Sequence, residues 1–141
     1  MGDFHEFQRR VYFADTDAGG VMYHARYLDF AESARTEALR DAGVPHQKLV
    51  LEHGVSFIVQ MANIEYLRPA RLDDLITIRT HCTEVRGASA RLTQIFLSDG
   101  TELARVSVRL GCVGVSDFRP RRLPAAWLAA LRDLRGEVQQ G

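Results

Sequence analysis

The chain has 141 residues, of which 46% are hydrophobic and 26% are charged, and its formal net charge is zero. This length and composition predict one globular domain over residues 1–141. The balanced charge gives no electrostatic reason to expect nucleic acid or an anionic membrane as a partner. No apolar run approaches the roughly 20 residues needed to cross a bilayer, and the opening MGDFHEFQRR lacks the apolar centre of a signal peptide. We therefore expect a cytoplasmic protein without an integral membrane segment.

The first third of the chain is predicted to form a strand, a loop and a long helix. Val11 and Phe13 alternate with other side chains, which is typical of a strand over Phe7–Ala14. Aspartate, threonine and glycine residues then predict a loop over Asp15–Val21. From about Tyr23 to Ala42, small and apolar residues recur every three or four positions, which predicts a helix of about five turns. That stripe consists of Tyr27, Phe30, Ala31, Ala34 and Ala38.

The rest of the chain is predicted to be mostly strands. Gly43 lies where a helix C-cap belongs, Pro45 prevents continuation, and a short helix is expected at His46–His53. The hydrophobic period then falls to two, which predicts four long strands: Val55–Arg68, Leu75–Arg86, Ala88–Ser98 and Leu103–Ser116. Asp99-Gly100 is a strong hairpin signal. The tail WLAALRDLR, residues 127–135, predicts a short amphipathic helix.

This order of elements predicts an α+β fold. Four long, meandering antiparallel strands need a cover for their apolar face, and the long helix is the only element large enough. Small residues on that helix, such as Ala31 and Ala34, allow its backbone to lie close to a sheet. We therefore expect the sheet to curl around the long helix.

The chemically distinctive segment is the junction between the first strand and the long helix, D-T-D-A-G-G at residues 15–20. It delivers carboxylates beside the first helical turn, whose backbone N–H groups lack intrahelical partners and carry a partial positive charge. Gly19 and Gly20 leave the backbone open to a substrate. A carboxylate, an open loop and oriented donors are the parts that acyl transfer requires. The local pattern alone, however, favours a helix-capping role for such an aspartate and a surface position for His24.

Metal chemistry has little support in the sequence. The loop begins like a calcium site, but the twelfth position from Asp15 is Arg26, where a bidentate glutamate is required. The five histidines show no ligand spacing, and there is no Cys-x-x-Cys. We expect neither a metal nor another cofactor.

Residues 10–27, RVYFADTDAGGVMYHARY, resemble the active-site signature of the 4-hydroxybenzoyl-CoA thioesterase family of hotdog-fold proteins. The matching positions are Arg10, Val11, Thr16, Asp17, Gly20, Val21, His24 and Tyr27. The chain is most similar to the YbgC-type acyl-CoA thioesterases found beside Tol-Pal genes, and the likeness continues through residues 32–44, 65–74 and 85–94. The resemblance implies a hotdog fold, in which a five-stranded antiparallel sheet wraps around a long central helix.

The resemblance also implies an activity: hydrolysis of a short-chain or aromatic acyl-CoA to the free acid and CoA. In this family the second aspartate of the loop is catalytic, which selects Asp17 over Asp15, either as nucleophile or as general base for a water molecule. Backbone N–H groups around Tyr23 and His24 would polarise the thioester carbonyl, and the His24 side chain is a second catalytic candidate. The residues expected to contact substrate are Gly20, Val21, Tyr23 and Tyr27.

Partners follow from the same resemblance. Candidates for binding CoA are Arg86, Gly87 and Ser89, and a second basic cluster at Arg119, Arg121 and Arg122 could meet the same phosphates. The family forms dimers joined into tetramers with shared active sites, so we expect a homo-oligomer of this kind. Two other functions stay open: an acyl carrier protein (ACP) thioesterase, and a non-catalytic interaction module linked to Tol-Pal or phospholipid synthesis.

Overall fold

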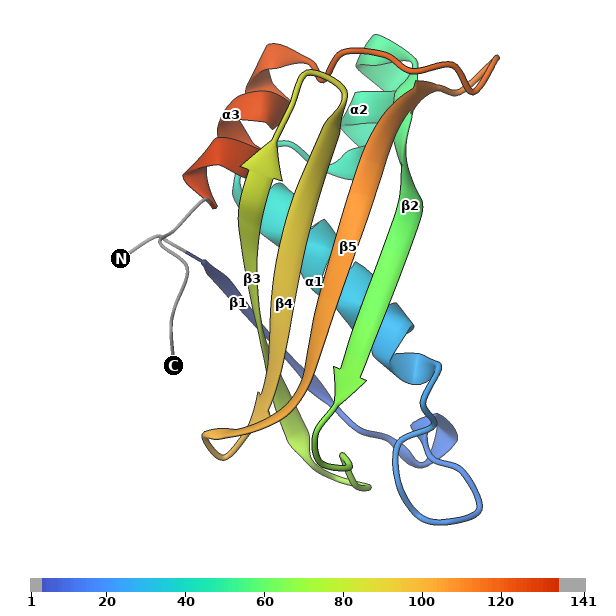
Figure 1. The fold of residues 1–141 in the computed structure, drawn as a ribbon, viewed down its shortest axis with the longest axis vertical. Coiled ribbons are helices and arrows are strands. Elements are labelled where there is room, and N and C mark those ends of the chain that lie inside the picture. The colour runs from blue at the N-terminus through green and yellow to red at the C-terminus, as the bar shows by residue number, and fades with distance from the viewer. Residues whose placement is uncertain (1–3, 135–141) are drawn as a thin grey trace.

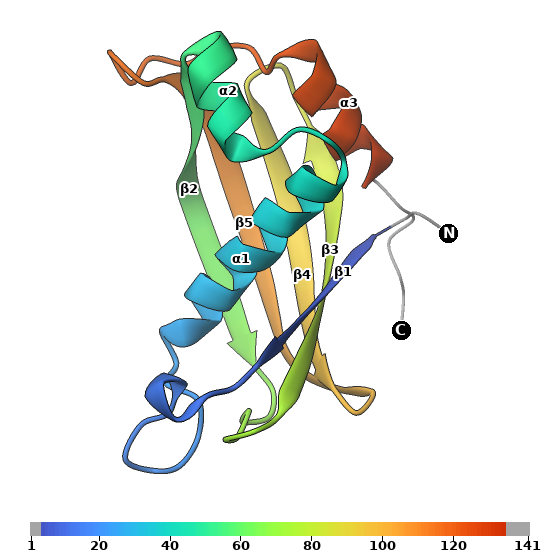
Figure 2. The ribbon, with the colours of Figure 1, turned by 180° about the vertical axis from the view of Figure 1, so that it is seen from behind.

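The computed structural model describes residues 4–134, which form one antiparallel sheet and three α-helices. The strands are β1 His5–Arg10, β2 Val55–Tyr66, β3 Leu75–Val85, β4 Ser89–Ser98 and β5 Thr101–Gly114. The helices are α1 Arg26–Asp41, α2 His46–His53 and α3 Ala125–Asp133. Seen from behind, α1 runs diagonally across one face of the sheet, and α2 and α3 lie together at one end (Figures 1 and 2). The α+β fold with a sheet around a central helix is therefore confirmed.

Helix α1 approaches the sheet closely because the residues that face it are small. Ala31 and Ala34 are fully buried, and Phe30 beside them fills the core. Gly43 ends the helix as predicted: it has a positive φ of 84°, and the Val44 N–H donates to the Leu39 carbonyl at 3.0 Å. This bond is typical of a glycine C-cap.

The strand order corrects the predicted meander. The order is β1-β3-β4-β5-β2, so only β3, β4 and β5 follow one another as neighbours. β2 instead pairs with β5 along its whole length, with Val55 opposite Gly114 and Tyr66 opposite Ala104. A two-residue period shows that a segment is a strand, but it does not specify the partner of that strand. The consequence is that β2, a long strand, lies at an edge of the sheet, with Val59 and Met61 exposed.

The predicted first strand is too long at its C-terminal end. β1 ends at Arg10, and Phe13–Asp15 forms a short 3-10 turn in which Phe13 is 81% exposed. The Asp15 carboxylate accepts a hydrogen bond from the Tyr12 N–H at 2.9 Å and so closes this turn. This local side-chain bond replaces the strand ladder, as aspartate often does. The long helix likewise begins at Arg26 rather than near Tyr23.

The other predicted boundaries agree to within a few residues. β2, β3 and β5 each end one or two residues before the predicted strand. Asp99 and Gly100 both have positive φ, 50° and 78°, as a two-residue hairpin turn of this type requires. α3 starts two residues earlier than predicted, at Ala125, and the last residue of the predicted tail helix lies outside the described residues.

A buried hydrogen-bond network ties α1 to the sheet. The Gln94 side chain on β4 is fully buried. Its Nε2 donates to the Ala31 carbonyl at 2.8 Å and to Thr80 Oγ1 at 3.0 Å. Its Oε1 accepts from Arg35 Nη1 at 3.0 Å. Because every polar atom of this amide has a partner, burial of the group does not leave an unsatisfied donor or acceptor.

The close approach of α1 predicts a steric effect on stability. Ala34→Leu adds three carbon atoms at a fully buried position, and such overpacking should lower the free energy of unfolding by about 1–3 kcal/mol. Arg40→Leu on an exposed turn of the same helix is the matched control, with an expected change below about 0.5 kcal/mol. Urea unfolding followed by circular dichroism measures both. Equal midpoints for the two variants would contradict the close packing.

Candidate active site

Asp15 organises the loop that precedes α1. It is only 6% exposed, and its Oδ2 accepts the Tyr12 N–H while its Oδ1 lies 3.3 Å from Arg26 Nε in an ion pair. Its backbone carbonyl accepts the Tyr23 N–H at 2.8 Å. Both carboxylate oxygens and the carbonyl are therefore committed to holding the 3-10 turn, the loop and the start of α1 together.

Asp17 has the opposite environment. Its side chain is exposed, and its Oδ1 accepts one hydrogen bond, from the Gly19 N–H at 2.8 Å. Within residues 4–134, Oδ2 has no hydrogen-bond partner. A Cβ on Gly19 would lie 3.2 Å from Asp17 Oδ1, tighter than an ordinary contact, and Gly20 has a positive φ of 82°. The glycines thus permit a turn that presents this carboxylate with one oxygen available for chemistry.

Two cavities flank the loop, and the predicted site residues are divided between them. Asp17 and Tyr23 line a cavity of about 360 Å³. Val21, His24 and Tyr27 line a second cavity of about 290 Å³. Gly20 lines neither of them. The single chain therefore gathers the signature at one end of α1 without bringing all of it into one cavity.

The start of α1 offers one free backbone donor of the two predicted. The Tyr23 N–H is occupied by the Asp15 carbonyl, whereas the His24 N–H has no acceptor among the described residues. The carbonyl of His24, in the next peptide group, accepts the Tyr66 hydroxyl at 2.9 Å and holds the backbone at His24 against the end of β2. An unpaired N–H at a helix start can stabilise a developing oxyanion.

Tyr27 is a wall of the second cavity. It is 3% exposed, and its phenolic oxygen accepts the Ala70 N–H at 3.3 Å. Its ring meets that of Tyr66 edge-on, with centroids 5.1 Å apart. Burial raises the pKa of the Tyr27 hydroxyl, so the phenol remains neutral at physiological pH.

Sequence reasoning missed part of this second cavity. Besides Met22, the rest of its lining comes from the end of β2 and the residues that follow it: Tyr66, Leu67, Arg68 and Pro69. They belong to the segment 65–74, which resembles the family, but the strand pattern alone gives no sign that the end of β2 returns to the start of α1. The hydrogen bond between Tyr66 and His24 depends on a contact across 42 residues of sequence.

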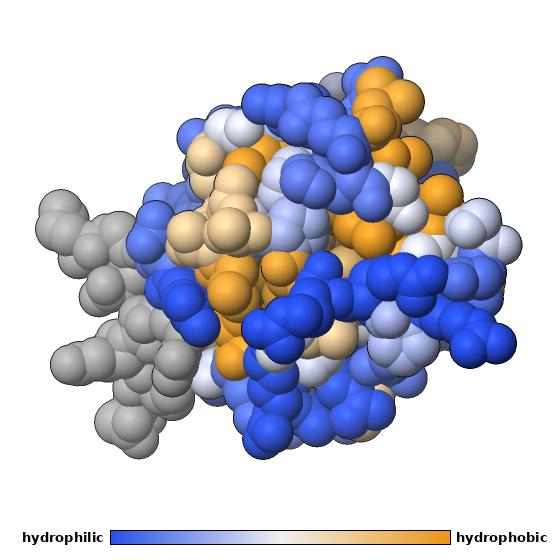
Figure 3. Space-filling view, turned by 90° about the horizontal axis from the view of Figure 1, so that it is seen from above, coloured by the Kyte–Doolittle hydropathy of each residue, from blue (hydrophilic) through white to orange (hydrophobic). Residues whose placement is uncertain are grey.

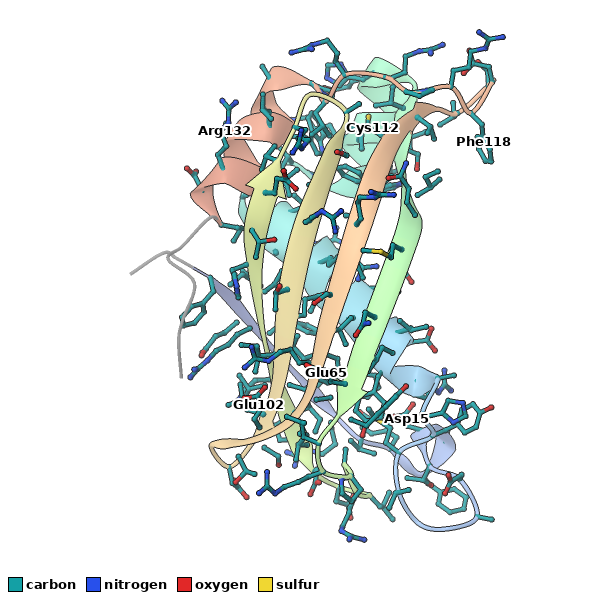
Figure 4. The ribbon with its side chains drawn as sticks, in the orientation of Figure 1. Asp15, Glu65, Glu102, Cys112, Phe118 and Arg132 are labelled. Atoms are coloured by element: carbon teal, nitrogen blue, oxygen red, sulfur yellow. The ribbon has the colours of Figure 1, made fainter. Side chains whose placement is uncertain are left out.

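The predicted CoA-binding residues lie at the other end of the molecule. Figure 4 labels Asp15 at one end and Cys112 and Phe118 near the other. Along β5, the residue opposite Tyr66 is Ala104 and the residue opposite Ser89 is Gly111. Seven strand residues separate these positions, a distance of about 23 Å. Within one chain, Asp17 and Ser89 are therefore too far apart to contact the same small chemical group of a ligand.

The two predicted basic clusters do come together at that far end. A Cβ on Gly87 would lie 3.0 Å from Arg122 Nη1, and the Leu123 N–H donates to the Gly87 carbonyl at 2.7 Å. Arg86 forms an ion pair with Glu84 at 2.6 Å, and Arg121 forms one with Asp117. Figure 3, which looks onto this end, shows strongly hydrophilic residues gathered across it. The turn at residues 86–89 and the segment 119–122 form one basic surface.

Within residues 4–134, no group of three or more His, Cys, Asp or Glu side chains is arranged to hold a metal ion. No helix in the same range is long and apolar enough to span a membrane.

Comparison with known proteins assigns the family. The model of the thioesterase-like superfamily matches residues 11–131. The chain belongs to this superfamily. It is 40% identical over 129 residues to the acyl-CoA thioesterase YbgC of Haemophilus influenzae, covering 92% of this chain and 95% of that protein. It is 44% identical to the acyl-CoA thioester hydrolase YbgC of Escherichia coli O157:H7, covering 87% of this chain and 92% of the relative.

A solved structure agrees with this assignment. The crystal structure of a protein described as a probable thioesterase from Bartonella henselae superimposes with a TM-score of 0.82 at 41% identity, and covers 86% of this chain and 99% of that one. The predicted family, the hotdog fold and the class of enzyme, a thioester hydrolase, are thus confirmed. The comparisons assign the class of enzyme, and the roles of individual residues are proposed below from the geometry of the site.

The contrast between the two loop aspartates can be tested on stability. Asp15→Ala leaves the Tyr12 N–H and one face of Arg26 without an acceptor, so we expect a loss of about 1–3 kcal/mol. Asp17→Ala removes only one exposed hydrogen bond, so we expect a change within about 0.5 kcal/mol. Urea unfolding of both variants is the measurement. A larger loss for Asp17→Ala than for Asp15→Ala would reverse the assignment of the structural carboxylate.

Proposed function

We propose that this thioesterase hydrolyses short-chain or aromatic acyl-CoA to the free acid and CoA, with Asp17 as the catalytic carboxylate. The observation that carries the proposal is the free Oδ2 of Asp17 in a cavity at the start of α1. The neighbouring carboxylate, Asp15, is buried and fully committed. YbgC-type relatives at 40–44% identity are named as acyl-CoA thioesterases, which supports the substrate class.

The chemistry has two routes from the same atoms. In the first, Asp17 Oδ2 attacks the thioester carbonyl carbon, CoA leaves as the thiolate, and water hydrolyses the resulting anhydride. In the second, Asp17 takes a proton from a water molecule that attacks the carbonyl directly. In both, negative charge develops on the carbonyl oxygen, and the unpaired His24 N–H is the donor we assign to it. After a single turnover in ¹⁸O-labelled water, label in the Asp17 carboxylate would establish the first route, in which water attacks the Asp17 carboxyl carbon of the anhydride. Direct attack of water on the thioester puts the label only in the released acid.

The His24 side chain is the second proposed catalytic group. It lines the cavity with Val21 and Tyr27, and its ring lies 4.5 Å from that of Tyr23. We assign it to orientation of the substrate or of the departing thiol. Gly20, Val21, Tyr23 and Tyr27 remain the proposed substrate contacts, with Gly20 acting through the shape of the loop, because it lines neither cavity.

Neutralising Asp17 tests the central claim. Asp17→Asn keeps the size of the side chain and its bond from Gly19, but it removes the charge needed by either route. We expect thiol release from a panel of acyl-CoAs to fall by at least about 100-fold, with an unchanged unfolding midpoint. Asp99→Asn, an exposed aspartate in the β4–β5 turn, is the matched control. Native turnover by folded Asp17→Asn would disprove the assignment.

A second copy of the chain supplies what one chain lacks. β2 is a 12-residue strand at the edge of the sheet, and its residues Val59 and Met61 are exposed. Unpaired edges of this kind favour pairing with another strand. We propose that two copies pair antiparallel along β2. A two-fold axis at the strand midpoint, between residues 60 and 61, would set Tyr66 beside the partner's Val55.

Such pairing would complete the site from both subunits. In each chain the Val115 N–H donates to the Gly54 carbonyl at 3.0 Å, so the segment 115–122 begins beside the start of β2. The basic surface of one copy would then lie near the Asp17 end of the other, where CoA phosphates need cations. The sheet face that carries no described helix would join two dimers into the expected tetramer (Figure 1). A monomer mass by light scattering at micromolar concentration would contradict this assembly.

Subunit mixing tests the shared site. We expect Asp17→Asn and the triple variant Arg119→Ala, Arg121→Ala, Arg122→Ala each to be strongly impaired alone. When the two variants are co-expressed at equal levels, half of the dimers contain one copy of each. Each mixed dimer has one site in which both Asp17 and the three arginines are intact. Activity should therefore recover to about one quarter of the native value. No recovery in isolated mixed dimers would show that the arginines do not act across the interface.

Activity assays and the Asp17→Asn variant also distinguish acyl-CoA hydrolysis from two other functions. The basic surface at residues 86–89 and 119–122 would also suit an acidic carrier protein, so acyl-ACP is the alternative substrate. The other is an interaction module linked to Tol-Pal or phospholipid synthesis, which would bind an envelope partner equally well with Asp17→Asn. Hydrolysis of acyl-ACP at a higher kcat/KM than acyl-CoA would favour the first alternative. A cytoplasmic location follows from either substrate, because both are made inside the cell.

A further inference from the structure

Two further cavities continue from the Asp17 cavity along α1. One, of about 240 Å³, shares Asp29 with the Asp17 cavity. The next, of about 90 Å³, shares Glu32, Arg35 and Val59 with the first. Their apolar lining comes from α1, β2 and β5 and consists of Leu28, Leu39, Phe57, Val59, Ala62, Val108 and Leu110. We call this row of cavities the α1–β2 groove.

Arg35 is the cation in this apolar groove. It is half-buried, and its one hydrogen bond, through Nη1, is to the neutral Gln94 amide at 3.0 Å. No carboxylate among the described residues lies within ion-pair distance of it, although Glu32 is on the same turn of α1. Burial lowers the pKa of Arg35, but a guanidinium remains charged at physiological pH. Its other nitrogens are therefore donors without protein acceptors, facing the groove.

The orientation of Arg35 is built into the core. Gln94 Oε1 accepts from Arg35 because Gln94 Nε2 is held by the Ala31 carbonyl and Thr80 Oγ1. Gln94 and Thr80 are both fully buried. The amide cannot turn without breaking two bonds, so the guanidinium is fixed by groups that no solvent molecule reaches. A half-buried, oriented cation with unused donors in an apolar groove is typical of a binding site rather than of a solvated helix face.

We propose that Arg35 selects acyl groups that carry a neutral oxygen, a hydroxyl or a carbonyl, toward the distal end of the chain. This inference rests on the proposed thioesterase function and names a substrate class for it. An acyl group bound with its thioester at the start of α1 would extend along the α1–β2 groove past Asp29. Nine residues separate Arg26 from Arg35, about 13 Å along the helix. Short acyl groups would react without reaching Arg35, whereas medium-length ones would end beside it.

The selection follows from desolvation. A plain alkyl chain in the groove would remove water from the free donors of Arg35 and offer no acceptor in return, which is costly for a charged group. A distal hydroxyl or carbonyl oxygen would accept from the guanidinium and restore the lost bonds. A distal carboxylate would also meet Glu32, which lines the same groove and is on the same turn of α1 as Arg35. The negative charge of Glu32 disfavours a second carboxylate and so favours the neutral oxygen.

The experiment compares four acyl-CoA substrates in the native protein: butyryl, decanoyl, ω-hydroxydecanoyl and ω-carboxynonanoyl. We expect kcat/KM for the ω-hydroxydecanoyl substrate to exceed that for decanoyl by about tenfold or more, with the ω-carboxy substrate below the hydroxy one. In Arg35→Gln the ratio of hydroxydecanoyl to decanoyl should fall close to one. Arg35→Lys should keep part of the preference, because an ammonium also donates.

Arg40→Gln is the matched control. Arg40 lies on the same helix, is exposed, and pairs with Glu37, so its substitution should leave the ratio at the native value. Thermal unfolding of each variant checks that it is folded. If Arg35→Gln does not fold, the ratio in the native protein and in Arg35→Lys still decides the question.

The experiment distinguishes a missing role of Arg35 from a missing thioesterase activity. Equal kcat/KM for decanoyl and ω-hydroxydecanoyl in the native protein, with butyryl turned over, would overturn the role of Arg35 and leave the thioesterase proposal intact. If none of the substrates is hydrolysed, isothermal titration with the same acyl-CoAs decides instead. Tighter binding of the hydroxy than of the plain chain, lost in Arg35→Gln, would support the Arg35 site without the activity. Equal binding would overturn it.

Discussion

Close packing of α1 against the curved sheet sets the position of each functional feature of this thioesterase. Ala31 and Ala34 are fully buried, and the helix backbone lies near enough to β4 for the Gln94 amide to reach the Ala31 carbonyl. Because the sheet bends around the helix, the start of α1 and the end of β2 meet at the same end of the molecule, where the Tyr66 hydroxyl donates to the His24 carbonyl. The loop that carries Asp17 is thereby held beside an open helix end. A larger residue facing the sheet would move α1 outward and disturb both contacts.

The two aspartates of the loop illustrate how stability and chemistry are kept apart. A buried carboxylate must be fully hydrogen-bonded or ion-paired, or its desolvation destabilises the fold, and Asp15 meets this requirement through Tyr12 and Arg26. The carboxylate that we propose as catalytic must instead keep an oxygen available, and Asp17 keeps its Oδ2. Two glycines next to Asp17 make this possible, because a side chain at Gly19 would crowd the carboxylate and one at Gly20 would strain the backbone. The rigid carboxylate supports the loop from which the exposed one projects.

Much of the fold could be predicted from the sequence, because its signals are local. The stripe from Tyr27 to Ala38 predicts α1, Gly43 predicts where α1 ends, and Asp99-Gly100 predicts the hairpin between β4 and β5. The pairing of β2 with β5 could not be predicted, because a strand period carries no information about a partner some 50 residues away. The site divides in the same way. The loop aspartates and glycines stand in the sequence, and the resemblance distinguished Asp17 from Asp15. Three features of the site depend instead on packing between distant segments. They are the free N–H of His24 where that of Tyr23 is occupied, the cavity wall formed by Tyr66, and the close approach of Gly87 and Arg122.

In the proposed assembly a single chain is an incomplete enzyme, because the two groups of proposed site residues lie at opposite ends of the molecule. Asp17 and the start of α1 lie at one end, and the basic surface of residues 86–89 and 119–122 lies about 23 Å away along β5. An edge strand that pairs antiparallel with its own copy brings opposite ends together by symmetry alone. The same edge borders the α1–β2 groove, since Val59 is both exposed on β2 and part of the wall around Arg35. Pairing along β2 would therefore position the cations for CoA and close the groove over the acyl chain in one step, which links substrate selection at Arg35 to assembly of the enzyme.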